Sequence, residues 1–290
     1  MAQHLLNMEC NAFGQRLLFD LVSTPVQNED DVTPDEKINR LREFYQRENA
    51  LVTSPFIDDQ LNLNHALFEH VRRSLHLEFQ DKTILDVGCG SGMLASFFQD
   101  HRHYLGLDLN VRQSFHILKD DSHAYAQANA LQLPVHNRSC DIVICMDSFE
   151  HFPDQGAAAR EIKRVLKPDG EFLLSVPTYA NVAGIVKMVC ECTGTYEKNT
   201  WAPFDYWKPE ELEHFMTPKR IRKVFQAAGF STFTRIGYDK EVAVGLFPWV
   251  WHPKMPGKVA AAISKSVSLI AKPVCAVWPE SSLHTFWKIQ

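Results

Sequence analysis

The sequence predicts an α/β protein built on a mostly parallel β-sheet. An apolar run at residues 83–87 has the length of a buried strand, and Gly88, Gly90 and Gly92 allow the tight turn that follows it. Helix-compatible residues continue over 93–99, so a strand, a glycine turn and a helix follow one another as in a βαβ unit. The chain has 290 residues, of which 45% are hydrophobic, and can therefore bury one large core with additions.

Later segments repeat this alternation of strands and helices. A helix carries Ile162, Val165 and Leu166 at helical spacing, and it ends where the sequence Lys-Pro-Asp-Gly at 167–170 turns the chain into the next strand. A further helix is expected at 217–228. The remaining strands are expected at 104–110, 140–146 and 171–176, with a final pair at about 231–237 and 241–246.

The spacing of the glycines distinguishes two classes of cofactor. Gly92 comes one residue earlier than the third glycine of the dinucleotide-binding fingerprint G-x-G-x-x-G. Asp86 lies just before the turn, where its carboxylate would repel a pyrophosphate and suit a ligand with an ammonium group. Asp108 ends the second strand, where a carboxylate can accept hydrogen bonds from both hydroxyls of a ribose or, alternatively, cap a helix.

These residues, and the segments that follow them in order, resemble the class I S-adenosylmethionine (SAM) dependent methyltransferases. Residues 84–92 resemble motif I of that family, and residues 127–135 resemble its Gly-Asp-Ala-x-x-Leu-Pro-Phe segment. The likeness is to the type 11 and ubiquinone-biosynthesis O-methyltransferases, and it covers about residues 80–177 and, more loosely, 213–246. It implies a Rossmann-like, doubly wound, mostly parallel seven-stranded sheet with N-terminal helices and a C-terminal lid or extension. SAM is then the cofactor, and dinucleotide binding is the alternative.

The resemblance also indicates which residues bind SAM. Asn129 stands at an acidic position of the family, where its carbonyl oxygen can accept a hydrogen bond from the adenine amino group unless it is only a turn residue. Tyr45 belongs to a helical stripe with Ile38, Leu41 and Phe44, which either covers the cofactor or is simply a packed face. The expected cofactor-binding residues are Asp86, Gly88, Cys89, Gly90, Asp108, Leu109, Asn129, Ala130, Met146 and Tyr45.

The chain divides into four parts. Tyr196, Trp201, Tyr206 and Trp207 belong to an insertion after the fifth strand, where they either wall the acceptor pocket or fasten a lid. The parts are an N-terminal helical cover (1–79), a SAM-binding half (80–177), an acceptor-site insertion with the final helix and strands (178–248), and an aromatic, basic C-terminal extension (249–290).

An acceptor pocket should open at the carboxyl ends of the fourth and fifth strands. A hydroxyl or phenol acceptor needs a base there; His151, which follows the fourth strand, is the first candidate and His214 the second. The alternative is a divalent cation, because Asp147-x-x-Glu150-His151 resembles the Glu-x-x-Glu-His with which ubiquinone-biosynthesis O-methyltransferases and small-RNA 2′-O-methyltransferases hold a metal. The shorter aspartate favours a site without metal.

The sequence therefore predicts a SAM-dependent methyltransferase that acts on a small or lipid-like acceptor, preferably at oxygen. The alternatives are N- or C-methylation of a natural-product or glycan intermediate, and a non-catalytic scaffold with the same fold. The net charge of −5 gives no electrostatic footprint for nucleic acid. Seven cysteines without a C-x-x-C pair indicate a reduced, cytoplasmic protein.

The tail carries a separate pattern. From Trp249 to Gln290 there are five lysines and one acidic residue. Lysines recur every seven residues at 258, 265 and 272, and an apolar face holds Val259, Ile263, Val267 and Ile270. Such a basic amphipathic helix predicts docking onto the domain or a dimer partner, with peripheral membrane contact as the alternative. The longest near-continuous apolar run, at 242–251, is too short to span a membrane.

Overall fold

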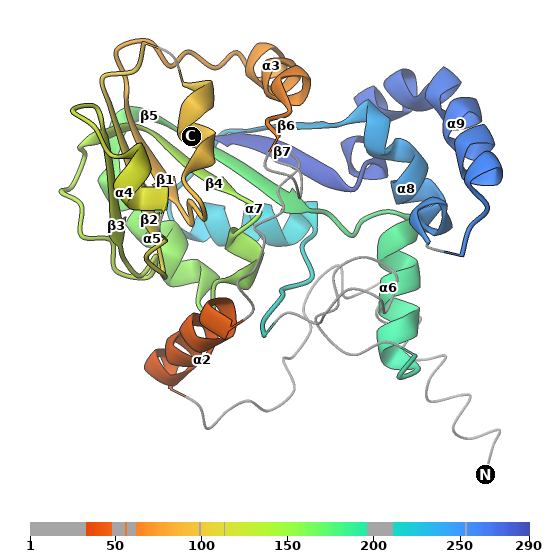
Figure 1. Ribbon diagram of the computed structural model, residues 1–290, viewed down its shortest axis with the longest axis horizontal. Helices are drawn as coiled ribbons and strands as arrows, with labels where there is room; N and C mark the ends of the chain where they lie inside the picture. Colours follow the sequence, from red (N-terminus) through yellow and green to blue (C-terminus); the bar gives the residue numbers. More distant parts are fainter. Residues whose placement is uncertain are drawn as a thin grey trace.

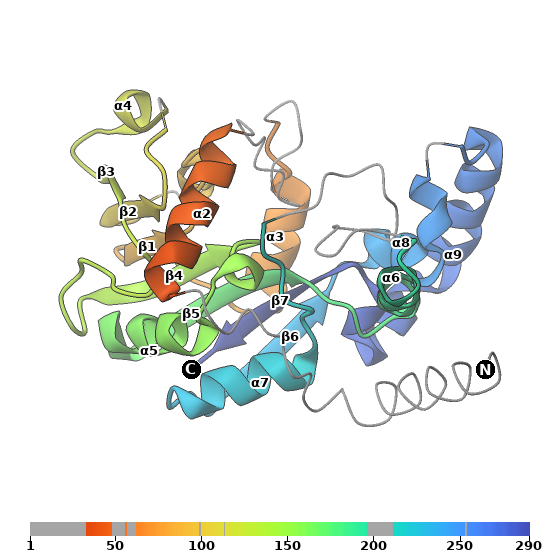
Figure 2. The same cartoon turned by 90° about the horizontal axis from the view of Figure 1, so that it is seen from below.

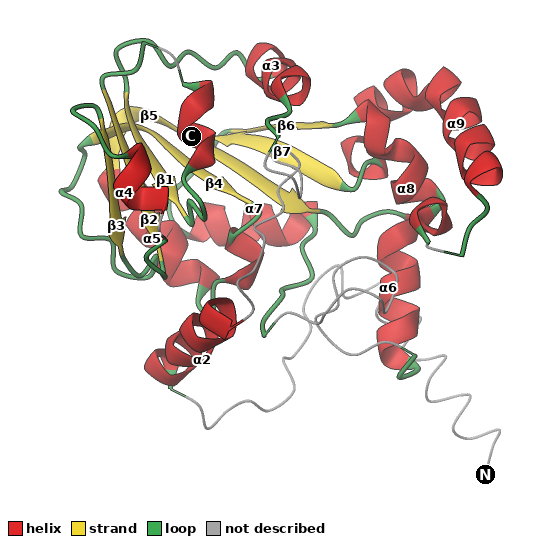
Figure 3. Ribbon diagram, in the orientation of Figure 1, coloured by secondary structure: helices red, strands yellow, loops and turns green. Residues whose placement is uncertain are grey.

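The computed structural model describes residues 33–47, 56, 62–98, 100–112, 114–195, 211–252 and 254–290. One seven-stranded sheet with the order β3-β2-β1-β4-β5-β7-β6 forms its centre (Figures 1 and 3). The strands are β1 (Thr83–Val87), β2 (His103–Asp108), β3 (His123–Gln127), β4 (Cys140–Met146), β5 (Leu166–Pro177), β6 (Phe233–Gly237) and β7 (His284–Ile289). Strands β1 to β5 run parallel and β7 is antiparallel to both neighbours, which confirms the predicted Rossmann-like α/β sheet.

Helices pack on both faces of this sheet. The α-helices are α2 (Pro34–Arg47), α3 (His65–Ser74), α4 (Ser114–Leu118), α5 (Gln155–Val165), α6 (Val182–Cys192), α7 (Pro218–Ala227), α8 (Val242–Leu246) and α9 (Gly257–Val277). The 3-10 helices are η1 (Met93–Phe97), η2 (Phe149–His151), η3 (Asp239–Glu241), η4 (Pro248–Trp251) and η5 (Pro279–Ser281). Figures 1 and 2 show α5 and α7 together on one face and α3 on the other.

The two faces of the sheet bury separate apolar cores. Leu85 and Val143 point toward α5 and α7, whereas their neighbours Ile84 and Ile144 point toward α3 and η1. Successive residues of a strand face opposite sides, so a sheet covered on both sides needs apolar residues at every position. This explains why the strands stand out in the sequence as short continuous apolar runs.

The strand order reverses between β1 and β4, and this reversal places the site. The chain runs from β1 outward to β2 and β3, and then returns to β4 on the other side of β1. Asp86 pairs with Ile144, so the turn after β1 and the loop after β4 start from the same edge of the sheet. Because the two connections leave in opposite directions, a crevice opens between them at the carboxyl ends.

Two elements differ from the prediction. Residues 93–97 form the 3-10 helix η1 rather than the start of an α-helix, directly after Gly92 with its φ of 78°. Residues 241–246 were expected to form a strand. Instead, Glu241 is the last residue of η3 and residues 242–246 form α8, and the last strand of the sheet is β7. A short apolar run such as Val-Ala-Val-Gly-Leu does not distinguish a strand from a buried helix by its periodicity. Position 245 of this helix requires glycine, because a Cβ there would lie 2.0 Å from the Ser281 carbonyl oxygen.

A small helical layer extends the molecule beyond β6. Figures 1 and 2 show α8 and α9 side by side at this end, with α6 next to them. Val267, Ala271 and Cys275 of α9 pack on Val242 and Ala243 of α8. Among the described residues, α9 is the one helix whose length and composition would let it cross a membrane. The expectation that no segment reaches that length overlooked this helix, because lysines and serines interrupt its apolar positions.

Candidate active site

A cavity lies at the carboxyl ends of β1, β2 and β4, with α2 across its opening (Figure 2). Ile38, Leu41 and Tyr45 of α2 line it, so the predicted helical stripe does cover this edge of the sheet. Most of the predicted site residues meet around the cavity, namely Tyr45, Gly88, Gly90, Asp108, Leu109, Asn129, Ala130 and His151. Sequence analysis did not single out Val87, Leu107, Arg112, Ala128, Leu131, Leu133, Ser148, Phe152 and Pro153, which also line it.

The glycine turn brings the chain close to the loop after β4. Gly88 has a φ of +79°, and a Cβ on it would lie 2.6 Å from both Cβ and Oγ of Ser148. The Ser148 hydroxyl donates a hydrogen bond to the Gly88 carbonyl over 3.0 Å. An L side chain would therefore be strained at position 88 and would also push the two loops apart.

Asp108 fastens the glycine turn to the end of β2. Its Oδ2 accepts a hydrogen bond from the Gly90 N–H at 2.9 Å, and its Oδ1 accepts one from the Asn110 N–H at 3.0 Å. Burial raises the pKa of this carboxyl, although both backbone donors oppose the shift. Asp108 caps no helix, since the next helix, α4, begins at Ser114. The carboxylate lines the cavity and has further lone pairs for a diol.

Asn129 is both a turn residue and a cavity residue. Its Oδ1 accepts a hydrogen bond from the Leu131 N–H over 2.9 Å, which makes the short turn before Leu133. An amide oxygen has two lone pairs, so Asn129 can still accept a second bond from a ligand, and its NH2 group can donate. The two interpretations of this residue are therefore compatible.

Three predicted cofactor residues lie behind the cavity wall. Asp86 is fully buried, accepts a hydrogen bond from the Tyr104 hydroxyl, and leaves Oδ1 without a partner among the described residues. Burial raises the pKa of Asp86 to about 7. Cys89 is buried near Gly106, and Met146 belongs to the core under α3. None of the three side chains lines the cavity, so we expect Asp86 to act on a ligand through its charge.

His151 is held in one tautomer at the cavity wall. Its Nδ1 lies 2.7 Å from the Leu212 carbonyl oxygen, which can only accept, so Nδ1 carries the proton. In the neutral ring Nε2 then keeps its lone pair, as a general base requires. The Tyr45 ring lies edge-on at 6.3 Å between centroids.

His214 is held at both ring nitrogens. The Arg220 guanidinium can only donate, so Nδ1 accepts its hydrogen bond at 3.0 Å, and Nε2–H donates to the Phe152 carbonyl at 2.9 Å. Burial, and then the nearby charge of Arg220, lower the pKa of His214 to about 4. This ring has no lone pair left for a substrate proton, so its geometry is that of a structural group that fixes the loop after β4.

Asp147 has a buried carboxylate oxygen, unpaired within the described part of the chain, at the end of β4. Its φ of 46° is left-handed, and the Ser175 hydroxyl donates to Oδ1 over 2.7 Å. Oδ2 is buried without a hydrogen-bond partner among the described residues, and the residue lines the cavity. Burial raises the pKa of Asp147, and the positive charge of His284 opposes that shift. Sequence analysis considered Asp147 only as a metal ligand.

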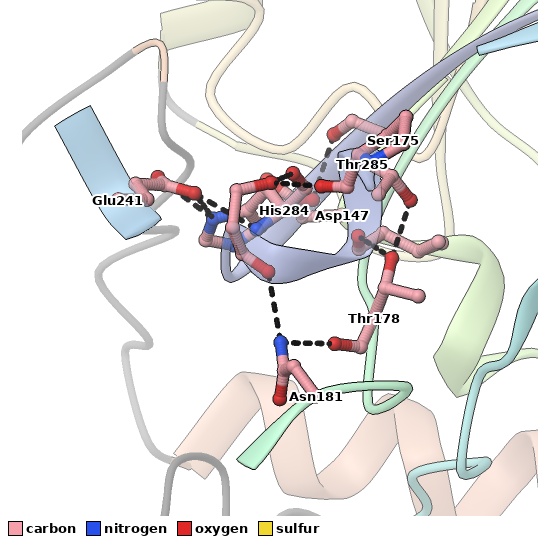
Figure 4. A network of polar contacts seen from close by, with 10 residues as sticks. Asp147, Ser175, Thr178, Asn181, Glu241, His284 and Thr285 are labelled. Atoms are coloured by element: carbon pink, nitrogen blue, oxygen red, sulfur yellow. Dashed lines mark hydrogen bonds and ion pairs between the residues drawn. The ribbon is translucent and has the colours of Figure 1, made fainter. Parts of the chain in front are cut away.

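A buried polar network lies behind Asp147 (Figure 4). Glu241 accepts hydrogen bonds from the backbone N–H of His284 at 2.8 Å and from its Nδ1 at 3.0 Å. Burial alone would lower the pKa of His284, but the carboxylates of Glu241 and Asp147 raise it to about 9. Thr178 bonds to Thr285, and the Asn181 amide donates to the Ser282 carbonyl, so the ends of β5 and β7 are tied together.

The expected metal alternative finds no matching geometry in the described residues. Within them, no group of three or more His, Cys, Asp or Glu side chains could hold a metal ion. Glu150 is buried, with its Oε1 3.8 Å from Nε2 of His151. The aromatic residues expected around the acceptor, Tyr196, Trp201, Tyr206 and Trp207, lie outside the described residues.

Comparison with known proteins identifies the family. A model of the methyltransferase domain matches residues 60–234, which is more than half of the chain. The chain belongs to the methyltransferase domain family. The matched stretch includes all five parallel strands, the glycine turn and the loop after β4. The predicted membership of a methyltransferase family is thereby confirmed.

Relatives of this methyltransferase include a phthiotriol/phenolphthiotriol dimycocerosates methyltransferase and a ubiquinone biosynthesis O-methyltransferase. Phthiotriol/phenolphthiotriol dimycocerosates methyltransferase 1 of Mycobacterium ulcerans is 30% identical over 146 residues, 48% of this chain and 53% of that protein. A ubiquinone biosynthesis O-methyltransferase of Serratia proteamaculans is 34% identical over 109 residues, 33% of this chain and 42% of that protein. The methyltransferase thus matches about half, or less, of the length of these two relatives.

A solved structure shares the fold. Phosphoethanolamine N-methyltransferase 2 of Haemonchus contortus, in complex with phosphomonomethylethanolamine and S-adenosylhomocysteine, has a TM-score of 0.53 at 15% identity. The match covers 89% of this chain and 59% of that chain. The residues around the cavity fit SAM. Gly88, which has no Cβ, lets a ligand approach the backbone closely, and the Asp108 carboxylate lines the same cavity.

Proposed function

We propose that this methyltransferase transfers a methyl group from SAM to an oxygen atom of a small or lipid-like acceptor. The observation that supports an oxygen acceptor is the tautomer of His151, which keeps a lone pair on Nε2 at the wall of the cavity. An amine or a carbanion-like carbon needs no such base, whereas a hydroxyl or phenol must lose its proton. The names of the two relatives, one a quinone-pathway O-methyltransferase, support the same acceptor class.

The cofactor would lie along the carboxyl ends of β1 and β2. Gly88 and Gly90 would let the cofactor lie close to the backbone of the turn. Asp108 would accept hydrogen bonds from the ribose hydroxyls, and Asn129 would lie beside the adenine. When bound, SAM supplies a methyl group on a sulfonium, which is already a good leaving group. The chain's own task is therefore mainly to align the acceptor and to remove water, and α2 helps by covering the cavity.

His151 would take the proton of the acceptor hydroxyl at Nε2. The hydrogen bond from Nδ1–H to the Leu212 carbonyl would stabilise the resulting imidazolium. Asp147, which also lines the cavity, would orient the same hydroxyl through its carboxylate. We place the reaction in the cytoplasm, since all six cysteines in the described part of the chain are free.

Methyl transfer from labelled SAM to a panel of phenols and lipid-linked hydroxyls tests this proposal. His151→Gln should lower kcat by about 100-fold or more, while SAM binding by calorimetry stays unchanged. The control His214→Gln changes a neighbouring histidine that has no free lone pair, and its kcat should fall far less. Full activity of His151→Gln would contradict the base, and transfer to amines alone would contradict the oxygen acceptor.

A further inference from the structure

One face of helix α9 packs against the rest of the molecule, and another face is exposed. Val267, Ala271 and Cys275 pack against α8, and Ile263 lies next to Val244 and Val250. The predicted docking onto the domain is therefore present. Several large apolar side chains of the helix are exposed, and Figure 1 shows α9 at the outer end of the molecule.

The open side of α9 carries a line of large apolar side chains. Val259, Ile270 and Val277 are spaced by 11 and 7 residues, about three and two helical turns, so they stand on one line. Leu269 lies beside them; its exposed fraction is 80% and that of Val277 is 88%. We call Val259, Leu269, Ile270 and Val277 the outer face of α9. Several exposed large apolar side chains on one side of a helix indicate an interaction site.

Exposed aromatic residues also occur in the chain before and after α9. Trp278 follows the last residue of α9 and is 38% exposed. Phe247 and Trp249, just before the helix, are about half exposed. Tryptophan rings favour the boundary between lipid headgroups and hydrocarbon, because their apolar body and polar N–H suit its two sides.

Positive charge lies next to this apolar surface. Lys258, Lys265 and Lys272 form a row along α9, seven residues apart, and all three are exposed. Residues 249–279 contain four lysines and no acidic residue, although the whole chain has a net charge of −5. This segment is thus cationic although the protein as a whole is acidic.

A cleft beside the lysine row extends the positive charge toward the sheet. Lys272 of α9 and Lys240 of η3 line it, and so does Arg235 of β6, whose charge is already paired with Glu280. One acidic residue, Asp239, also lines this cleft. The cleft is large enough, at about 580 Å³, for the polar headgroup of a phospholipid.

We propose that α9 binds the surface of an anionic lipid bilayer, with its outer face in the headgroup boundary and its lysine row on the lipid phosphates. Apolar residues beside lysines on one helix are the pattern of interfacial helices. The helix lies on the bilayer and does not span it, because its other face is buried against α8. A second copy of the chain fits less well, since a two-fold contact would place one lysine row against another.

Vesicle binding tests this inference without SAM or acceptor, so its result is independent of the proposed reaction. The full chain is floated with vesicles of phosphatidylcholine alone, and with vesicles containing phosphatidylglycerol at roughly one lipid in four. We expect binding to the anionic vesicles that weakens as salt rises. Changing Lys258, Lys265 and Lys272 to Gln together should lower the affinity about 100-fold, from about 5-fold per lysine.

Matched variants test whether vesicle binding depends on the outer face of α9 or on exposed residues in general. Leu269→Ser with Ile270→Ser should lower binding about 10-fold or more, whereas Ile117→Ser with Lys119→Gln, at the opposite end of the sheet near α4, should not change it. Equal binding by the lysine variant and this control would overturn the inference, and so would binding to neutral vesicles at full strength. A dimer in sedimentation that the Leu269 and Ile270 changes dissociate would assign the surface to a second copy instead.

Discussion

The two halves of the sheet organise their polar groups in different ways. In the cofactor half, Asp108 binds Gly90, only 18 residues earlier in the chain, and the turn residues follow their strands directly. In the half formed by β5, β7 and β6, the key contacts join distant segments: Thr178 and Thr285 are 107 residues apart, and Asn181 and Ser282 are 101 apart. Local motifs build the first half, and long-range pairing builds the second.

The buried charge pair of the second half should give the largest effect on stability. His284→Gln removes the cation beside Glu241 and should lower the free energy of unfolding by as much as about 5 kcal/mol. In the wild type, the folded pKa of about 9 exceeds the ordinary value of 6.5. The stabilisation is therefore complete below pH 6.5, falls by about 3 kcal/mol as the pH rises to 9, and is absent above it.

Urea unfolding between pH 6 and about 9.5 measures this dependence. The double variant Glu241→Gln with His284→Gln removes both charges and should recover much of the loss while having a flat pH profile. The charge-pair explanation fails if His284→Gln keeps the wild-type slope over this window.

The buried carboxylate of the cofactor half should act in a different pH window. Burial raises the pKa of Asp86 from 3.8 to about 7, so its contribution to stability is present below pH 4 and is lost as the pH rises through 7. Asp86→Asn keeps an oxygen for the Tyr104 hydroxyl and should remove this loss, worth up to about 4 kcal/mol in the SAM-free protein. Unfolding curves between about pH 4.5 and 8 should then be flatter than wild type, whereas the exposed control Asp169→Asn should retain the slope.

A change in the glycine turn should affect binding more than stability. Gly88→Ala meets Ser148 at 2.6 Å and should weaken SAM affinity about 100-fold, near 3 kcal/mol, by displacing the loop after β4. Gly194→Ala is the matched control, because its φ of +70° is also left-handed but nothing lies within 4 Å of the added Cβ. Calorimetric titration should show wild-type affinity for the control; equal losses in the two variants would attribute the effect to φ alone.

The same contrast explains which parts of the structure could be predicted from the sequence. Strands β1, β2, β4 and β5 and most of the predicted site residues were placed correctly, because each lies within a short motif whose glycines, carboxylates and apolar runs reflect local geometry, whereas β3 (His123–Gln127) was not predicted. The position of β7 could not be read in this way, since its partners Phe172 and Phe233 are fixed by pairing across the chain rather than by neighbouring residues.

Side-chain roles were harder to predict than positions. His151 and His214 look alike in the sequence, and only the carbonyl of Leu212 and the guanidinium of Arg220 show which ring keeps a lone pair. Asp147 could be recognised as unusual only from its left-handed backbone and its buried Oδ2, which is unpaired in the part of the chain that the structure describes. Asp86 fits the expected motif, but its side chain lies behind the cavity and bonds to Tyr104.

The late position of β7 in the sequence also affects how the protein folds during translation. Thr285 is translated 107 residues after Thr178, and at about 5–20 residues per second the ribosome needs roughly 5–20 s to make that stretch. Until then, the β5 edge that will receive Phe286 and Trp287 has no strand beside it. An open, apolar edge attracts other chains. Slow codons between β5 and β7 should therefore lower the soluble yield, and chaperones that bind nascent chains should raise it.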